Sequence, residues 1–296
     1  MRVAARFVTM LAALFALGAC TALQFSYNNA EGLLRYMAWD YFDLDADQAD
    51  ALQQRFVRLR EWHRSNQLPV YVGLLQAARE RIAKGVTSAD VDWATAALRS
   101  HYRSLAQRAA QDAAPVLASL KADQIDALEK KLAREDLRYV EKWLTGEEKP
   151  RHRRRVERMI EQFEEWTGDL NASQRSRIEG FVSSHSGVYE RRLEERRRWQ
   201  RQAVVLIKRH RTASELALSL GRLFAEPESG RSEAYARDMR RWESDLARLI
   251  VDLDTTLSAE QRGRVLRRME RYAADFRALS GERRATEEAI RRAPGS

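Results

Sequence analysis

The chain has 296 residues and carries 52 Lys and Arg against 43 Asp and Glu, which gives a formal net charge of +9. This moderate basic excess is typical of a solvated helical surface, although it also suits acidic partners such as lipid head groups or lipopolysaccharide. Only 13 Gly and 5 Pro argue against a strand-rich fold, and abundant Ala, Leu, Arg and Glu favour helix. We therefore expect an all-α protein, an extended or cradle-like multi-helix bundle with two similar helical halves.

Residues 1–19 have the pattern of a signal peptide and are expected to be removed. Arg2 and Arg6 form a positive start, and the apolar run 7–17 is too short to span a bilayer as a helix. The run ends in L-G-A-C, which resembles a bacterial lipobox, and Cys20 is the only cysteine. The resemblance implies cleavage before Cys20, with a covalent diacylglycerol and an N-acyl chain on that residue. The alternative is an ordinary secretory signal with an incidental cysteine.

Acylation of Cys20 would anchor the mature protein to a membrane without spanning it. Thr21 follows the cysteine, where an Asp would resemble an inner-membrane retention signal. The predicted location is therefore the periplasmic face of the outer membrane, where a protein meets little nucleic acid. An acylated Cys20 leaves no cysteine for a disulfide, a thiolate metal site or a nucleophile.

Residues 20–43 join this anchor to the rest of the chain and are rich in aromatic side chains. The large apolar residues of this segment are Phe25, Tyr27, Leu33, Leu34, Tyr36, Met37, Trp39, Tyr41 and Phe42. Such a segment either lies on the membrane interface or forms a first helix packed into the core. We favour the helix in the core.

Four related pentapeptides follow, and each precedes a charged run with helical periodicity. They begin at Leu44, Leu120, Leu170 and Leu257 and end at Gln48, Gln124, Gln174 and Gln261. In such a helix start the second residue accepts a bond from an amide of the first turn, and the Gln reaches back to the cap's own N–H. Ser258 in the last copy suits the cap, whereas Lys121 in the second does not. We interpret these residues as structural helix caps.

The pentapeptides divide the chain into two similar helical halves, 44–168 and 169–280, before a disordered tail at 281–296. The interval between the first and second copies is close to that between the third and fourth. We favour an internal duplication over a chance likeness of capped helices.

Periodicity and punctuation also predict the order of the elements. In the first half they are a helix to Trp62, a break at Leu68-Pro69, a helix to Lys84, a helix from Thr87 that Pro115 kinks or ends, a helix over 121–145 and a helix opened by 149–155. In the second half a helix runs from the third pentapeptide to Arg211 with an interruption near Ser186-Gly187. A short helix to about Ala225, a loop over 226–230, a helix over 232–255 and a last helix to about Leu279 follow. The apolar stripe of helix 121–145 contains Ile125, Leu128, Leu132, Leu137, Val140 and Leu144.

The sequence lacks a recognisable catalytic or metal-binding pattern. Among His63, His101, His152, His185 and His210, no two have the spacing that places two ligands on one helical face. There is no Gly-rich phosphate loop, no G-x-S-x-G and no HExxH. Almost every carboxylate has an Arg or Lys within a helical turn, as surface ion pairs do. We predict no catalytic residue, metal site or non-covalent cofactor, and an enzyme is the least favoured class.

The densest basic run is the candidate anion-binding site. It contains Lys149, Arg151, Arg153, Arg154 and Arg155. The basic runs 191–198 and 208–211 would extend such a face. Glu194 and Glu195 interrupt the first of these, as in a solvated helix with many ion pairs. We favour the solvated helix over anion binding.

Nearly the whole chain resembles a family of proteobacterial helical lipoproteins of unknown function. The resemblance is carried by the lipobox, the aromatic first segment with Tyr27-Asn28 and Trp39, and the helical, Arg-rich body. It implies a fold and a location but no activity.

A narrower resemblance is to the L-[S/T]-x-x-Q motif of the small helical periplasmic chaperones of the Spy and CpxP type. Leu257 to Gln261 fits that motif, whereas the other copies carry Asp, Lys or Asn at the second position. The resemblance implies a cationic, cradle-shaped protein that holds unfolded clients without ATP. Because the motif is also a capping device, it supports the helical fold more than the chaperone role.

We therefore expect a non-enzymatic binding protein, chaperone-like or a scaffold, which holds unfolded envelope proteins through a basic helical surface. The alternative is a lipid or lipopolysaccharide interaction protein for envelope maintenance, with contacts at 25–42 and 149–155. An open basic cradle would favour protein clients, and a continuous apolar tunnel would favour lipid. The sequence predicts no oligomeric state.

Overall fold

The computed structural model describes residues 22–209 and 212–292, with side chains described over 23–209 and 212–281. Throughout these residues every regular element is a helix, which confirms the all-α fold. Cys20 and the predicted signal segment lie outside them. In chain order the elements are α2 (Ala22–Asn28), α3 (Ala30–Phe42), α4 (Ala46–Trp62), the π-helical turn η1 (His63–Gln67), α5 (Leu68–Lys84), α6 (Ser88–Ala118), α7 (Ala122–Trp143), α8 (Glu148–Thr167), α9 (Ala172–Ser184), α10 (Val188–Arg209), α11 (Ala213–Ala225), α12 (Glu233–Asp254) and α13 (Ala259–Arg292).

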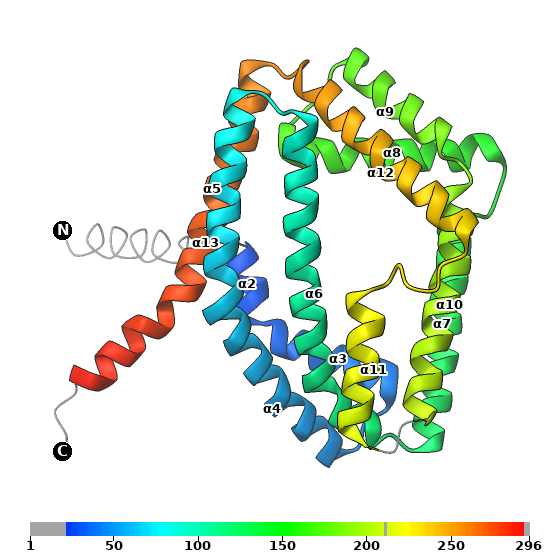
Figure 1. The fold of residues 1–296 in the computed structure, drawn as a ribbon, viewed down its shortest axis with the longest axis vertical. Helices are drawn as coiled ribbons and strands as arrows, with labels where there is room; N and C mark the ends of the chain where they lie inside the picture. The colour runs from blue at the N-terminus through cyan, green and yellow to red at the C-terminus, as the bar shows by residue number, and fades with distance from the viewer. Residues whose placement is uncertain (1–21, 210–211, 293–296) are drawn as a thin grey trace, which may run out of the picture.

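The helices are arranged as a frame (Figure 1). Along one edge α5 packs against α13, and along the opposite edge α7 packs against α10. Helices α8, α9 and α12 form one end of the frame, and α3 and α4 lie at the other. Helix α6 runs between the two edges and carries α11 along its side. The main contacts therefore join helices that are far apart in the sequence.

Two clusters of buried apolar side chains hold the frame together. The first lies where α6, α7, α10 and α11 meet, and Ala110, Ala114 and Leu216 in it are fully buried. The small alanines of α6 let α11 approach closely, and a Cβ added at Gly221 would lie 3.9 Å from the Cβ of Ala110. The second cluster joins α8, α9 and α12 around Ile178.

A new helix begins at Leu68-Pro69, as predicted, but no loop separates it from α4. Helix α4 continues into η1, which leads directly into α5, and the N–H of Leu68 donates to the carbonyl of His63 five residues back. Pro69 lies in the first turn of α5, where a missing N–H costs little. A π-helical turn therefore takes the place of a loop where the chain changes direction between α4 and α5 (Figure 1).

Two predictions concern helix ends. Pro115 does not end its helix, because α6 continues to Ala118 around it. Residues 281–292 are not a disordered tail, because α13 continues to Arg292. Ala, Glu and Arg dominate that segment, and all three have high helix propensity. Residues 293–296 lie outside the described part of the chain.

The other helix boundaries agree with the predicted ones to within a few residues. Helix α9 ends at Ser184 and α10 begins at Val188, so the predicted interruption is present. Helix α12 follows the predicted loop and ends at Asp254. The predicted end of α10 at Arg211 falls outside the described residues.

Candidate functional site

All four pentapeptides lie at helix N-termini, as predicted, where they start α4, α7, α9 and α13. In α4 the carboxylate of Asp45 accepts a hydrogen bond from the N–H of Gln48 (3.0 Å), and Oε1 of Gln48 accepts one from the N–H of Asp45 (3.1 Å). The same reciprocal bonds join Asn171 with Gln174 and Ser258 with Gln261.

The second pentapeptide keeps only half of this arrangement, because the Lys121 side chain has no acceptor atom. Oε1 of Gln124 still accepts a bond from the N–H of Lys121 at 2.9 Å. The ammonium group of Lys121 bonds instead to the carboxylate of Asp45, at 3.1 Å, at the start of α4. The copy with the weakest predicted cap is thus linked to the cap of another copy.

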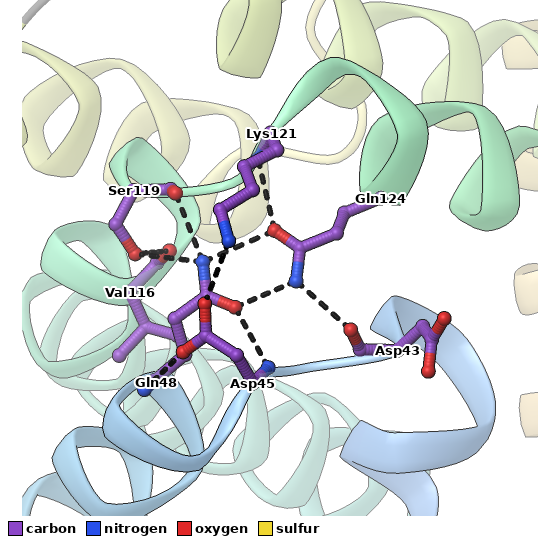
Figure 2. A network of polar contacts seen from close by, with 7 residues as sticks. All are labelled: Asp43, Asp45, Gln48, Val116, Ser119, Lys121 and Gln124. Carbon is purple, nitrogen blue, oxygen red and sulfur yellow. Dashed lines mark hydrogen bonds and ion pairs between the residues drawn. The ribbon is translucent and has the colours of Figure 1, made fainter.

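The first and second pentapeptides meet through their glutamines, which are 76 residues apart (Figure 2). Nε2 of Gln124 donates to Oε1 of Gln48 at 2.6 Å, and Nε2 of Gln48 donates to Oε1 of Gln124 at 3.1 Å. Gln48 also donates to the carbonyl of Ser119, and Gln124 to that of Asp43, each at 2.9 Å. We call this glutamine pair, with its two carbonyl partners, the N-terminal clasp.

The third and fourth pentapeptides form an equivalent C-terminal clasp, whose glutamines are 87 residues apart. Gln174 and Gln261 exchange amide hydrogen bonds of 3.0 Å in both directions. Gln174 also donates to the carbonyl of Thr256 at 3.1 Å, and Gln261 to that of Asp169 at 2.8 Å. In both clasps each glutamine therefore donates to the residue directly before its partner's pentapeptide.

The clasps satisfy polar groups that the fold removes from water. Gln48, Gln124 and Gln174 are 7%, 5% and 0% exposed, and every amide hydrogen and oxygen of these side chains has a partner. A buried amide without a partner costs about 1–3 kcal/mol. The motif glutamines thus hold helix starts together, and an amide pair supplies no reactive group.

The leucines of the motif contribute packing. Leu170 is buried in the second core cluster, and Leu120 packs against the first, which contains Ile125. Leu44 and Leu257 are half-buried.

The helix contacts repeat between the two halves. In the first half α4 packs on α6, and in the second half α9 packs on α12. Helix α7, which starts at Gln124, packs on α10 of the other half, and α13, which starts at Gln261, packs on α5. Helices of each half thus pack on helices of the other, and the two form one interlocked body.

The basic run is not a free anion-binding face, and the candidate ligand Arg155 is only 1% exposed. Its guanidinium donates to the carbonyls of Trp143 (2.9 Å) and Ser186 (3.0 Å). It also lies 4.2 Å from the ring centroid of Tyr189. The prediction for Arg155 is therefore wrong, because this residue joins the end of α7 to the start of α10.

Two more arginines of the run bond to the segment directly after α7. Arg151 donates to the carbonyl of Leu144 at 2.9 Å, and Arg154 to that of Thr145 at 3.0 Å. Carbonyls at a helix end lack partners within the helix and attract cations. The two exposed members of the run are Lys149 and Arg153.

The aromatic segment packs on the core only in part, at Tyr41 and Phe42, which lie against the first cluster. It forms α2 and α3, and Ala38 is the buried residue of α3. The exposed large side chains are Phe25, Leu33, Tyr36, Met37 and Trp39. A hollow of about 420 Å³ lies between α3 and α4, with Leu34, Leu52 and Phe56 among its lining residues.

Helices α7 and α10 border an open groove of about 650 Å³, which we call the α7/α10 groove. Its apolar lining consists of Leu132, Ala133, Leu137, Val204 and Val205. Leu137 and Val205 are 60% and 57% exposed, so the apolar part of the groove is open to solvent.

Cations lie along this groove. Lys208 pairs with Glu129 at 2.8 Å and Arg197 with Asp136 at 3.2 Å, and Arg201 is exposed beside them. The groove therefore combines apolar and positive surface. Each of its carboxylates, Glu129 and Asp136, is paired with a cation.

The groove was not predicted, because Leu137 belongs to the apolar stripe that was expected to be buried. Twelve residues of α-helix turn Leu137 about 120° away from Ile125, so it faces solvent. The available signal was the run 204–207, in which four consecutive apolar residues cover more than one face of α10.

Two histidines, the half-buried His63 and the buried His185, take part in side-chain packing. Nδ1 of His63 lies 2.9 Å from the hydroxyl of Tyr27, and burial lowers the pKa of His63 and raises that of Tyr27 to about 12. Nδ1 of His185 bonds to the carbonyl of Phe181 at 2.8 Å. Over the described residues, no three His, Cys, Asp or Glu side chains gather as a metal site.

None of the helices in the described ranges is long and apolar enough to cross a membrane.

A family model described as a family of unknown function, DUF6279, matches residues 40–236. The chain belongs to this family. The DUF6279 match contains the N-terminal clasp and the α7/α10 groove, and it ends within α12, before Gln261 of the C-terminal clasp. A search of curated proteins and a search of solved structures find no match. The function of this DUF6279 protein has to be argued from its own surfaces.

Proposed function

We propose that this chain is a lipoprotein, held at the periplasmic face of the outer membrane by acylated Cys20, which acts as a non-enzymatic binding protein, chaperone-like or a scaffold. The observation that carries the proposal is the α7/α10 groove, with its apolar lining and its cations. The N-terminal clasp fixes the start of α7, and Arg155 links the end of α7 to α10. Both helices of the groove are therefore held in place before a partner arrives.

The groove suits a protein segment that carries apolar and acidic side chains. Apolar side chains would cover Leu137 and Val205 and remove their surface from water. A carboxylate would meet Arg201, or exchange into the exposed pair of Lys208 and Glu129, because exposed ion pairs contribute little stability. Unfolded envelope proteins present such segments, and salt would weaken this binding.

The alternative function is interaction with lipid or lipopolysaccharide through residues 149–155 and the aromatic segment. It loses support at 149–155, because Arg151, Arg154 and Arg155 bond to carbonyls of the protein itself. Its other contact, the aromatic segment, is exposed.

The anchor is tested by mass spectrometry of the N-terminal peptide of the mature protein and by Cys20→Ser. We expect an acylated peptide that begins at Cys20, and a soluble protein after the substitution. An uncleaved or unmodified N-terminus would overturn the anchor.

The groove is tested by light scattering of an aggregating unfolded protein at low and moderate salt. We expect the chain from Thr21 onward to suppress aggregation, with suppression weakened by salt and lost in Leu137→Ser/Val205→Ser. The matched control is Leu98→Ser/Leu218→Ser, since both leucines are 68% exposed and lie away from the groove. No suppression at several-fold excess, or equal loss in both double variants, would overturn the proposal.

A further inference from the structure

The N-terminal helices carry the densest group of exposed apolar side chains in the described part of the chain. Phe25 is 66% exposed, and Leu33, Tyr36 and Trp39 are 62–63% exposed. With Met37 they lie within 15 residues, whereas the other exposed large apolar side chains are scattered over five helices. This concentration marks an interaction surface.

In α3 these side chains form one face. At 100° per residue, Leu33, Tyr36, Met37 and Trp39 fall within an arc of about 160°. Ala38, outside that arc, is buried. These four apolar side chains of α3 are therefore exposed together, whereas Tyr41 and Phe42 at the end of the helix pack against the first cluster.

The carboxylates of α3 are engaged by the protein. Glu31 accepts a hydrogen bond from Gln53 at 2.7 Å. Asp40 accepts one from the buried Lys131 of α7 at 2.5 Å, and that bond raises the pKa of Lys131. Arg35 is exposed at the edge of the apolar face, where a long cationic side chain can reach phosphate groups. The face and its margin therefore suit a phospholipid surface.

The apolar face of α3 lies close in sequence to Cys20, and this position indicates what covers it. Phe25 follows Cys20 by five residues, which an extended chain spans in at most about 18 Å. If Cys20 carries acyl chains in a bilayer, α2 begins at the surface of that bilayer. Trp and Tyr side chains favour this layer, because their rings are apolar with one polar group.

We propose that α2 and α3 lie flat on the bilayer that holds Cys20, with Leu33, Tyr36, Met37 and Trp39 inserted among the head groups. This inference rests on the proposed anchor. Helix α3 packs on α7, so the docked face would hold the α7/α10 groove within about one or two helix diameters, 10–20 Å, of the membrane. The groove would then capture its partners at the membrane surface.

The test uses the full acylated chain with Leu33→Cys or Leu98→Cys, labelled with an environment-sensitive fluorophore. Both leucines are more than 60% exposed, and the acylated Cys20 has no free thiol to react. The protein is reconstituted on phosphatidylethanolamine and phosphatidylglycerol vesicles that contain lipids with a nitroxide near the head group. We expect several-fold stronger quenching, and a blue-shifted emission, at position 33 than at position 98.

The outcomes separate the docking from the anchor. Flotation with vesicles but equal quenching at 33 and 98 would overturn the docking and leave the anchor standing. Failure to float would overturn the anchor, and the docking with it. If Leu33→Cys does not fold, Tyr36→Cys on the same face takes its place with the same expected result.

Discussion

The two clasps make the same hydrogen bonds between glutamines but differ in their capping residues. In the C-terminal clasp Asn171 and Ser258 each cap their own helix. In the N-terminal clasp Asp45 caps its helix, whereas Lys121 has no cap to offer and pairs with Asp45. The comparison shows that the pentapeptide has two separable tasks. Its second residue caps one helix, and its glutamine joins two.

This separation explains why a lysine is tolerated at one position of the motif. The side chain of Gln124 keeps every bond that the side chain of Gln261 makes, although the cap before it is lost. The clasp therefore depends on the glutamine and on the backbone position of the neighbouring segment. The cap contributes local helix stability alone.

The largest expected effect comes from removing a clasp glutamine. Gln174→Ala removes the donor to the carbonyl of Thr256 and leaves one N–H of the Gln261 amide without its acceptor, and we expect a loss of about 2–3 kcal/mol in the free energy of unfolding. Urea unfolding followed by circular dichroism measures it. Gln54→Ala, at an exposed position of α4, is the control and should stay within about 0.5 kcal/mol. Equal effects of the two substitutions would show that the clasp does not stabilise the fold.

A smaller effect is expected from exchanging the capping residues. Ser258→Lys removes a cap and should cost about 1 kcal/mol, because the facing residue Asn171 is neutral and cannot pair with the lysine. Lys121→Ser gains a cap but loses the pair with Asp45, so its net effect should be smaller. The same unfolding measurement compares the two variants. A neutral Ser258→Lys would contradict the separation of cap and clasp.

The smallest effect distinguishes the clasps by pH. The N–H of Gln48, followed by Lys121, lowers the pKa of Asp45. Ionised Asp45 therefore stabilises the fold above the pKa that its carboxyl has in the unfolded chain, near pH 4. This stabilisation is lost as the pH falls below that value. Asn171 and Ser258 do not titrate. Hydrogen exchange should show the amide of Gln48 losing more protection than that of Gln174 between pH 5 and pH 3, and an equal loss at both would contradict this account.

The helix starts could be predicted from the sequence because a cap depends on residues three apart. The clasps could not, because no local spacing indicates that Gln48 should meet Gln124 across 76 residues. The prediction for Arg155 failed for a related reason. Its partners are backbone carbonyls, which every residue carries, so no residue type in the sequence indicates them. The outward face of α3 was the less favoured of two interpretations, because an exposed aromatic helix and a core helix have the same composition.

The central claim is that each glutamine pair acts as one unit, and a double-mutant cycle on Gln174 and Gln261 tests it most directly. Either single alanine removes two of the hydrogen bonds of its partner amide, so the double variant should lose about 1 kcal/mol less than the two single losses combined. Gln48 and Gln124 should show the same coupling, while Gln124 and Gln174, from different clasps, should be additive. Additive losses within a clasp would contradict the claim.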